Sequence, residues 1–230
     1  MAKTTSLRSA NCLAAGLGLA VGAYAAYAGR TWWTYGRTRA AGPAWRDDLL
    51  DRFIPRYDVV ERHHIKVNAP AAVTLAAAAE QDLSASPVVR ALFKTRSFLM
   101  GARGPGRELP KGLIAQVKAL GWGVLAETET EIVMGAVTEP WKADVVFQAI
   151  PPESFAAFAE PGYVKIAWTL RADPEAAGGS TFRTETRVVA TDAEARARFR
   201  RYWSLASPGI SLIRWLSLVP VKCDAERRGA

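Results

Sequence analysis

The two histidines of the chain, His63 and His64, are the residues best suited to acid–base or metal chemistry, and they are adjacent. They lie in Val59–Val67, whose period-two pattern predicts a strand. Because neighbouring side chains of a strand point to opposite faces, the two imidazoles cannot share one metal ion. The only cysteines are Cys12 and Cys223, and no acidic cluster offers further ligands. We therefore predict neither a metal site nor a bound cofactor.

His63 is the one weak candidate for a catalytic residue. The alternation places it on the same face as Ile65 and Val67, which we expect to point into the core. An imidazole there could act as a general base in a cavity, or it could be a core histidine held by hydrogen bonds. Glu61 shares this face near the start of the strand, where an edge carboxylate in solvent is the ordinary interpretation. The sequence favours structural roles for both side chains.

Motifs of the common catalytic and nucleotide-binding sites are missing from the sequence. There is no Gly-x-Ser-x-Gly nucleophile elbow and no dinucleotide fingerprint. In the loop 101–112, Gly101 and Gly106 have the spacing of P-loop glycines, but Arg107 and Glu108 stand where Lys and Ser or Thr are needed. We expect no phosphate cradle. Whether the chain is an enzyme stays open, with a non-catalytic role favoured.

Positive charge is concentrated near the N-terminus. The net charge is +8, but residues 1–46 contain six basic residues and no acidic one, whereas the remainder has 24 basic and 22 acidic residues. Nucleic-acid binding requires a basic face on the folded domain, so we predict no nucleic-acid partner. Basic residues beside an apolar segment instead suit anionic lipid headgroups.

An apolar segment lies within this basic region. Between Arg8 and Arg30, 21 residues are uncharged, and as a helix they would span about 31 Å, close to the thickness of the hydrocarbon layer. Trp32 and Trp33 follow, a residue type that favours the membrane interface. We predict a single-pass membrane anchor through residues 9–29. More basic residues lie on its C-terminal side, which favours a cytoplasmic domain.

Other interpretations of the apolar segment remain open. Ala26-Tyr27-Ala28 fits a small-x-small cleavage site, so the segment could be a signal peptide and the domain could be exported after cleavage near Ala28. The segment could also be a buried helix of the soluble domain. A repeat of small residues at every fourth position would let two such helices self-associate. The repeat consists of Ala14, Gly18, Gly22 and Ala26.

Three regions follow from these patterns. Residues 1–35 form the anchor or signal peptide with its basic flank, residues 36–56 form a linker with a short helical turn, and residues 57–225 form one domain. After the opening strand we expect two helices and then mostly strands, and consecutive strands with short turns predict an antiparallel sheet. The expected helices are 71–80 and 87–100, and the further expected strands are 120–128, 131–137, 144–149, 163–171 and 181–190.

A long helix closes the domain. Thr191 and Glu194 form a Thr-x-x-Glu capping box at its start. Phe199 and Trp203 belong to one apolar stripe, which should face the sheet. Pro208-Gly209 should kink or break the helix, because proline cannot donate a helical hydrogen bond.

With this order of elements, the chain resembles the SRPBCC superfamily, which includes START lipid-transfer domains, the major birch pollen allergen and bacterial polyketide cyclases. The resemblance covers residues 57–225. It is carried by Glu61–Pro70, where the first strand runs into Ala-Pro and a helix, and by 135–141, 182–192 and 199–209. The apolar N-terminal segment followed by Trp33-Thr34-Tyr35-Gly36 is similar to an uncharacterised bacterial branch.

The resemblance implies an α+β helix-grip fold, in which a curved antiparallel sheet wraps around the long C-terminal helix and encloses an apolar cavity. Bulky aromatic residues on the faces that we expect to point inward, with two threonines on one wall, agree with a pocket that orients a polar end of a ligand. The same aromatic residues could instead simply fill a core. The expected ligand-binding residues are Trp122, Phe147, Ile166, Trp168, Phe182, Thr184, Thr186, Phe199 and Trp203.

The expected function is that of a membrane-anchored binding module for a hydrophobic small molecule or lipid. The resemblance also allows a polyketide-cyclase-like enzyme, because such cyclases use pocket shape and a few polar groups rather than a linear motif. His63 is then the first candidate. A third hypothesis is an accessory subunit of a membrane complex, assembled through the small-residue face of the N-terminal helix.

Overall fold

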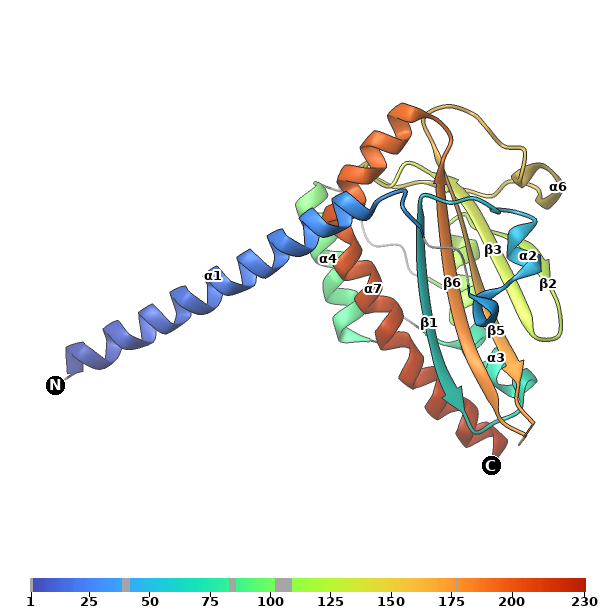
Figure 1. The fold of residues 1–230 in the computed structure, drawn as a ribbon. Coiled ribbons are helices and arrows are strands. Elements are labelled where there is room, and N and C mark those ends of the chain that lie inside the picture. Colours follow the sequence, from blue (N-terminus) through green and yellow to red (C-terminus); the bar gives the residue numbers. More distant parts are fainter. Residues whose placement is uncertain (1, 39–41, 83–85, 102–108, 177) are drawn as a thin grey trace.

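One antiparallel sheet with a long helix against its inner face organises the fold (Figure 1). The computed structural model describes residues 2–38, 42–82, 86–101, 109–176 and 178–230. The six strands follow the order β1-β6-β5-β3-β2, with β4 paired to β3, and every pair is antiparallel. The strands are β1 (Val59–Val67), β2 (Gly123–Glu127), β3 (Glu131–Thr138), β4 (Phe147–Gln148), β5 (Val164–Pro174) and β6 (Ser180–Ala190).

The helices agree with the α+β layout expected for a helix-grip fold. They are α1 (Ala2–Thr34), α2 (Asp48–Asp51), α3 (Ala71–Glu80), α4 (Pro87–Met100), α5 (Leu113–Ala119), α6 (Pro152–Phe155) and α7 (Ala193–Gly229), with a 3-10 turn at Pro43–Trp45. Bounds predicted for β1, α3 and α4 are confirmed, whereas β2 and β4 are shorter than expected and α5 was not anticipated. The loop in which we excluded a phosphate cradle includes residues 102–108, which lie outside the described residues.

The start of α7 corrects the predicted capping box. Asp192, not Thr191, is the N-cap, and its carboxylate accepts hydrogen bonds from the backbone N–H groups of Glu194 (2.7 Å) and Ala195 (2.9 Å). The hydroxyl of Thr191 instead accepts from the N–H of Tyr163 (3.1 Å) and joins the helix start to β5. Either side chain can cap a helix, so the sequence alone placed the boundary one residue early.

Helix α7 bends along its length (Figure 1) and continues past Pro208 to Gly229. Proline cannot donate to the carbonyl four residues earlier, which loosens the helix at this point. The neighbouring carbonyl of Leu205 accepts a hydrogen bond from the Tyr24 hydroxyl of α1 at 2.6 Å, and the Tyr27 hydroxyl lies 3.3 Å from the Ser207 hydroxyl. Helix α1 therefore binds α7 where α7 is weakest.

The junction between α1 and the domain is also fixed. The Tyr35 ring packs edge-on against Phe199 with a centroid distance of 6.0 Å, and the N–H of Gly36 donates to the carbonyl of Asp58 at 2.9 Å. Gly36 has a φ of +72°, and a Cβ there would collide with the Arg196 guanidinium, which pairs with Asp58 at 2.9 Å. Burial, with the Asp58 carboxylate nearby, raises the pKa of Tyr35 above its ordinary value.

The segment expected to be a linker contains the predicted helical turn, and part of it packs on the outer face of the sheet. Asp47 caps α2 by accepting from the Leu50 N–H at 2.8 Å. Leu50, Phe53 and Ile54 are buried against Val133 of β3 and other outer-face residues. The sheet is therefore covered on both faces.

This covering segment explains why charged side chains of β6 are buried. Arg187 is only 1% exposed and donates to Glu185 (2.7 Å), to the Ile54 carbonyl (2.9 Å) and to Asp51. Arg62 of β1 also donates to Glu185, at 2.9 Å. Because these charges are paired and hydrogen-bonded, they can remain inside the fold, although losing one partner would be costly.

By length and mean hydropathy, one helix among the described residues could cross a bilayer, and it is α7 rather than the N-terminal helix. The contacts of α7 with β1, β6 and α3 make it the core helix of the domain. Helix α1 projects away from the domain (Figure 1), and a Cβ atom added at Gly18 or Gly22 would contact no other part of the protein within 4 Å. The Ala14 side chain lies outside the described residues, so the small-residue face stays a prediction.

We predict that Leu50→Ala lowers the free energy of unfolding by about 2–5 kcal/mol, because it opens a cavity between the covering segment and the sheet. Asp48→Ala, an exposed change in the same helix, should cost less than about 1 kcal/mol. Urea unfolding followed by circular dichroism measures both values. Equal, small effects would show that residues 43–57 are not part of the folded unit.

Candidate functional site

The inner face of the sheet carries two apolar clusters. One cluster, near the C-terminal end of α7, joins Trp168 and Phe182 to Leu218 and Val221. The other, near the start of α7, joins Val188 to Phe199 and Trp203. The predicted inward faces of β5 and β6 are thus confirmed.

A group of polar side chains lies between these clusters. Glu61 of β1 accepts a hydrogen bond from Ser211 of α7 at 2.8 Å, and the Nε2 atom of His63 lies 3.2 Å from the same carboxylate oxygen. Arg214 of α7 donates to the Thr184 hydroxyl of β6 at 3.3 Å. We call these five residues the inner polar cluster. It is the only constellation of inward polar groups from three elements that the described residues show.

Arg214 is the most unusual member of the cluster. Its guanidinium has five donors, but among the described residues it makes one hydrogen bond and no carboxylate lies within 4 Å of it. It lies over the Trp168 ring at 5.6 Å. Burial lowers the pKa of Arg214 to about 10, opposed by the Glu61 charge, so the group stays protonated at neutral pH.

The inner polar cluster is partly exposed to solvent although helix α7 covers it. The side chains of Glu61 and His63 are 19% and 16% exposed, and Arg214 is partly exposed. Trp168 and Phe182, in contrast, are almost completely buried. Between the sheet and α7, solvent therefore reaches the polar centre, whereas the aromatic end is filled by side chains.

The predicted site residues divide into three groups. Trp122 stacks with Phe147 at 5.1 Å and meets Trp168 edge-on at 6.3 Å, at the β2–β4 side of the sheet. Ile166 packs with the Phe199 and Trp203 cluster. These two aromatic groups are not brought together, and the threonines lie between them.

The threonines and Phe182 share the inner face of β6. Thr184 pairs opposite His63 of β1, and Thr186 pairs opposite Glu61. The Thr184 hydroxyl meets Arg214, whereas the buried Thr186 hydroxyl has no partner among the described residues. An unpartnered buried hydroxyl is rare in proteins, and ligand sites are one place where it occurs.

Sequence reasoning missed three members of the inner polar cluster, namely Glu61, Ser211 and Arg214. Glu61 was assigned to a solvated edge, yet Ser211 and His63 contact it inside the fold. Arg214 is the only charged residue between Arg201 and Lys222 of α7. Its isolation within an apolar run could have marked it as a site residue, because a buried charge is costly unless it is paired or binds a ligand.

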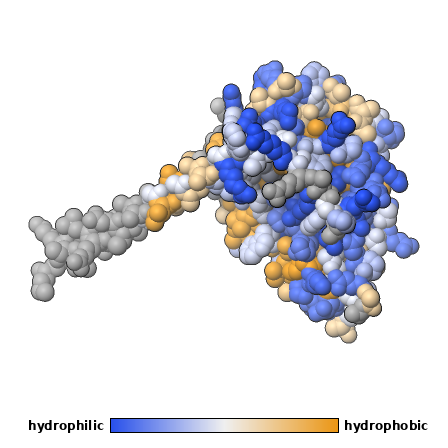
Figure 2. Space-filling model, viewed as in Figure 1, coloured by the Kyte–Doolittle hydropathy of each residue, from blue (hydrophilic) through white to orange (hydrophobic). Residues whose placement is uncertain are grey.

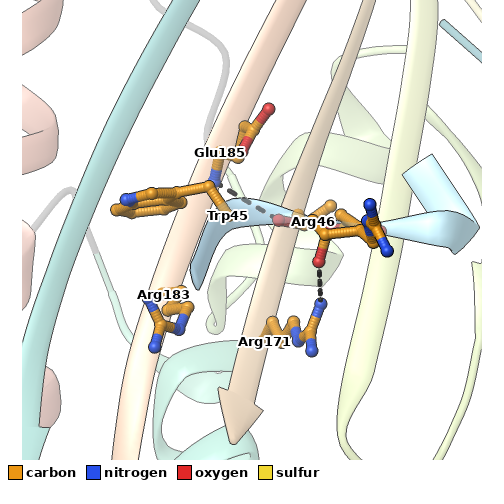
Figure 3. A pocket seen from close by; sticks show the side chains of 7 residues that line it. Trp45, Arg46, Arg171, Arg183 and Glu185 are labelled. Carbon is orange, nitrogen blue, oxygen red and sulfur yellow. Dashed lines mark hydrogen bonds between the residues drawn. The ribbon is translucent and has the colours of Figure 1, made fainter. Parts of the chain in front are cut away.

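A narrow pocket opens on the other face of the sheet, between Trp45 and the strands (Figure 3). Arg171 donates to the Arg46 carbonyl at 3.2 Å there, and Arg183 stacks on Trp45 at 5.3 Å. Its volume is about 10 Å³, which is room for about one water molecule. It is too small for an organic substrate.

Beside this pocket, Glu131 and Asp47 form a buried pair of carboxyl groups. Burial, together with the neighbouring Asp47, raises the pKa of Glu131 to about 8. One oxygen of Glu131 is buried and has no hydrogen-bond partner among the described residues. Perturbed carboxyl groups mark active sites in many enzymes, but here they close the gap between the covering segment and the sheet.

A second pocket, of about 210 Å³, lies at the tip of the β5–β6 hairpin beside the end of β1. Its lining includes Lys66, Glu175 and Ser180, and it is an open surface notch. Neither pocket lies between the sheet and α7, where the resemblance placed an apolar cavity.

Metal chemistry has no ligand set in the part of the chain that the structure describes, because no group of three or more His, Cys, Asp or Glu side chains comes together there. Cys223 is free and exposed. His63 and His64 point to opposite faces, as predicted: His64 packs edge-on against Trp45 outside, at 5.6 Å, whereas His63 belongs to the inner polar cluster.

No protein-family model and no curated protein matches the chain. Among solved structures it is similar to the Zhui aromatase/cyclase from Streptomyces sp. R1128, with 14% identity and a TM-score of 0.25, over 74% of this chain and 94% of that chain. It is also similar to Ara h 8.0201, with 10% identity and a TM-score of 0.20, over 68% of this chain and 98% of that chain. The fold assignment above rests on the strands and helices of this chain.

We predict that Glu131→Gln makes stability less dependent on pH. The folded chain keeps the Glu131 proton up to about pH 8, whereas an unfolded chain loses it near pH 4.5, so stability falls as the pH rises between these values. The variant should match the original chain at pH 4 and exceed it by about 1–3 kcal/mol at pH 8. Urea titrations across this range test the prediction, and a difference that is independent of pH would contradict it.

Proposed function

We propose that the chain is a membrane-tethered binding module of the SRPBCC type for a hydrophobic small molecule or lipid that carries an anionic group. The observation that supports this most directly is Arg214, a guanidinium on the inner face of α7 with no carboxylate within 4 Å among the described residues. An anionic headgroup would supply the charge-assisted hydrogen bonds that this arginine lacks.

The apolar part of the ligand would lie along the aromatic wall beside Arg214. Trp168 and Phe182 provide that wall on one side, and Ile166 on the other. The free hydroxyl of Thr186 would orient the polar end. Because Trp168 packs in one cluster with Phe182 and meets Trp122 edge-on, binding would require these side chains to separate, as in an adaptable pocket.

Helix α1 would hold this module at a bilayer. Its residues 16–26 that the structure describes are exposed and largely apolar, and Leu19 is 76% exposed. Trp32 and Trp33 lie at the end nearest the domain, with Arg200 and Arg37 stacked on them at 4.1 and 4.4 Å. A span through residues 9–29 with a cytoplasmic domain accounts for this apolar helix and its interfacial end.

We expect Arg214→Gln to weaken binding of cis-parinarate, a fluorescent fatty acid with a carboxylate end, by about tenfold, because the charge-assisted bonds are lost. Arg198→Gln, which removes an exposed arginine of the same helix, should leave binding unchanged. Fluorescence titration measures both, and native mass spectrometry of the full chain should show a co-purified anionic lipid that Arg214→Gln loses. Equal binding by the two variants would contradict the proposal.

A second candidate function, a cyclase- or hydratase-type enzyme, is favoured by one contact. The Nε2 atom of His63 lies 3.2 Å from Glu61, so the carboxylate could orient the imidazole as a general base. Addition of water to an enoyl thioester would use His63 to take a proton from water as oxygen attacks the β-carbon, and the α-carbon would receive a proton. Arg214 would stabilise the thioester oxygen in this scheme.

If this enzyme hypothesis is correct, the full chain hydrates crotonyl thioester, and His63→Asn lowers the rate by at least about a hundredfold. His64→Asn, a change on the outer face, serves as the matched control and should keep full activity. Loss of absorbance of the conjugated thioester reports the rate. Absence of turnover by the unmodified chain, or equal rates for both variants, would remove this class of reaction.

A further inference from the structure

An apolar stripe runs along the face of α7 that points away from the sheet. Its members recur at intervals that keep them on one side of a helix. They are Leu205 (59% exposed), Leu212 (39%), Trp215 (60%) and Val219 (55%). The opposite face of α7 packs on the domain, so this helix carries apolar side chains on its covered face and on its exposed face.

The stripe lies on the same side of the molecule as α1. The second half of α7 runs crosswise to α1, and apolar residues gather below the root of α1 (Figures 1 and 2). Helix α4 approaches α7 at Gly209, because a Cβ atom added to this glycine would lie 3.8 Å from the Leu92 side chain of α4. Helix α4 also exposes Phe98 (85%) and Val88 (45%). If α1 crosses a bilayer, the outer face of α7 lies along the surface of that bilayer.

The charged residues of α1, of α4 and of the stretch of α7 that carries the stripe are all basic. Helices α1 and α4 contain no acidic residue, and α7 contains none between Glu194 and Asp224. Arg30 and Arg201 are exposed beside the stripe. A protein partner could bind an apolar stripe that is surrounded by residues of either charge. Basic surroundings with an exposed tryptophan instead fit the anionic headgroup region of a membrane.

We propose that the outer face of α7, with α4 beside it, docks flat on a bilayer that contains anionic lipid, with Trp215 at the boundary between headgroups and acyl chains. This second membrane contact rests on the proposed function insofar as α1 provides the first one. Arg214 and Trp215 are consecutive: Arg214 belongs to the inner polar cluster, whereas Trp215 is exposed on the outer face of α7. The docked helix therefore separates a lipid surface from the inner polar cluster by its own thickness.

The test uses the full chain with Cys12→Ser and Cys223→Ser, reconstituted in phosphatidylcholine–phosphatidylglycerol vesicles. Single cysteines carry an environment-sensitive fluorophore, and doxyl-labelled lipid quenches the fluorophores that reach the bilayer. The positions are Leu212→Cys and Val219→Cys on the stripe, Leu19→Cys on α1 and Glu129→Cys at the exposed β2–β3 turn as a control. We expect a roughly twofold quench at positions 212, 219 and 19 and none at 129.

A further substitution separates the two membrane contacts. Trp215→Asp in the Leu212→Cys chain should abolish quenching at position 212, as should vesicles of phosphatidylcholine alone, whereas quenching at position 19 should persist. Thermal unfolding of each variant checks that the domain is intact. Quenching at position 19 without quenching at 212 would overturn the docking and leave the tether, whereas no quenching at 19 would overturn the tether itself. Quenching at 129 would show a different face on the membrane.

Discussion

The packing of α7 across the inner face of the sheet is the interaction on which the rest of the structure depends. This one helix contributes Phe199 and Trp203 to one apolar cluster, Leu218 and Val221 to another, and Arg214 to the polar centre between them. The helix bends along its length (Figure 1), and it contains Pro208, a residue type at which helices commonly bend. Beside this proline, the Leu205 carbonyl accepts a hydrogen bond from Tyr24, so that α7 also contacts the N-terminal helix.

Covering the outer face has consequences for the strands that carry the site. Arg62 and His64 of β1 alternate with Glu61 and His63, so any constraint on the outer side chains also fixes the inner ones. Arg62 is held by Glu185, and Trp45 packs on His64 from outside. The outer network thus sets the register that places Glu61 opposite Thr186 and His63 opposite Thr184.

Regular patterns in the sequence predicted most of the elements. Period-two alternation gave β1, and it gave the faces of β5 and β6, because a half-buried strand must alternate. The same patterns failed for residues 43–57, where Leu50 and Ile54 are too few to show a period. Arg214 and Glu61 escaped detection for a related reason: burial of a charge is decided by partners on distant elements, which a single strand or helix does not reveal. The ligand, the anchor and the catalytic role of His63 stay predictions.

The contacts of Tyr35 and Gly36 with the domain determine where a shortened chain can begin. Because Tyr35 contacts Phe199, and because residues 43–57 complete the outer layer, the unit able to fold does not begin at the first strand. A truncated chain that lacks the apolar part of α1 should start no later than Tyr35. A chain that starts at residue 57 would lack the segment that covers the outer face of the sheet, so Val133 and Phe155 would be exposed. Such a chain should aggregate through this exposed apolar surface, independently of any lipid binding.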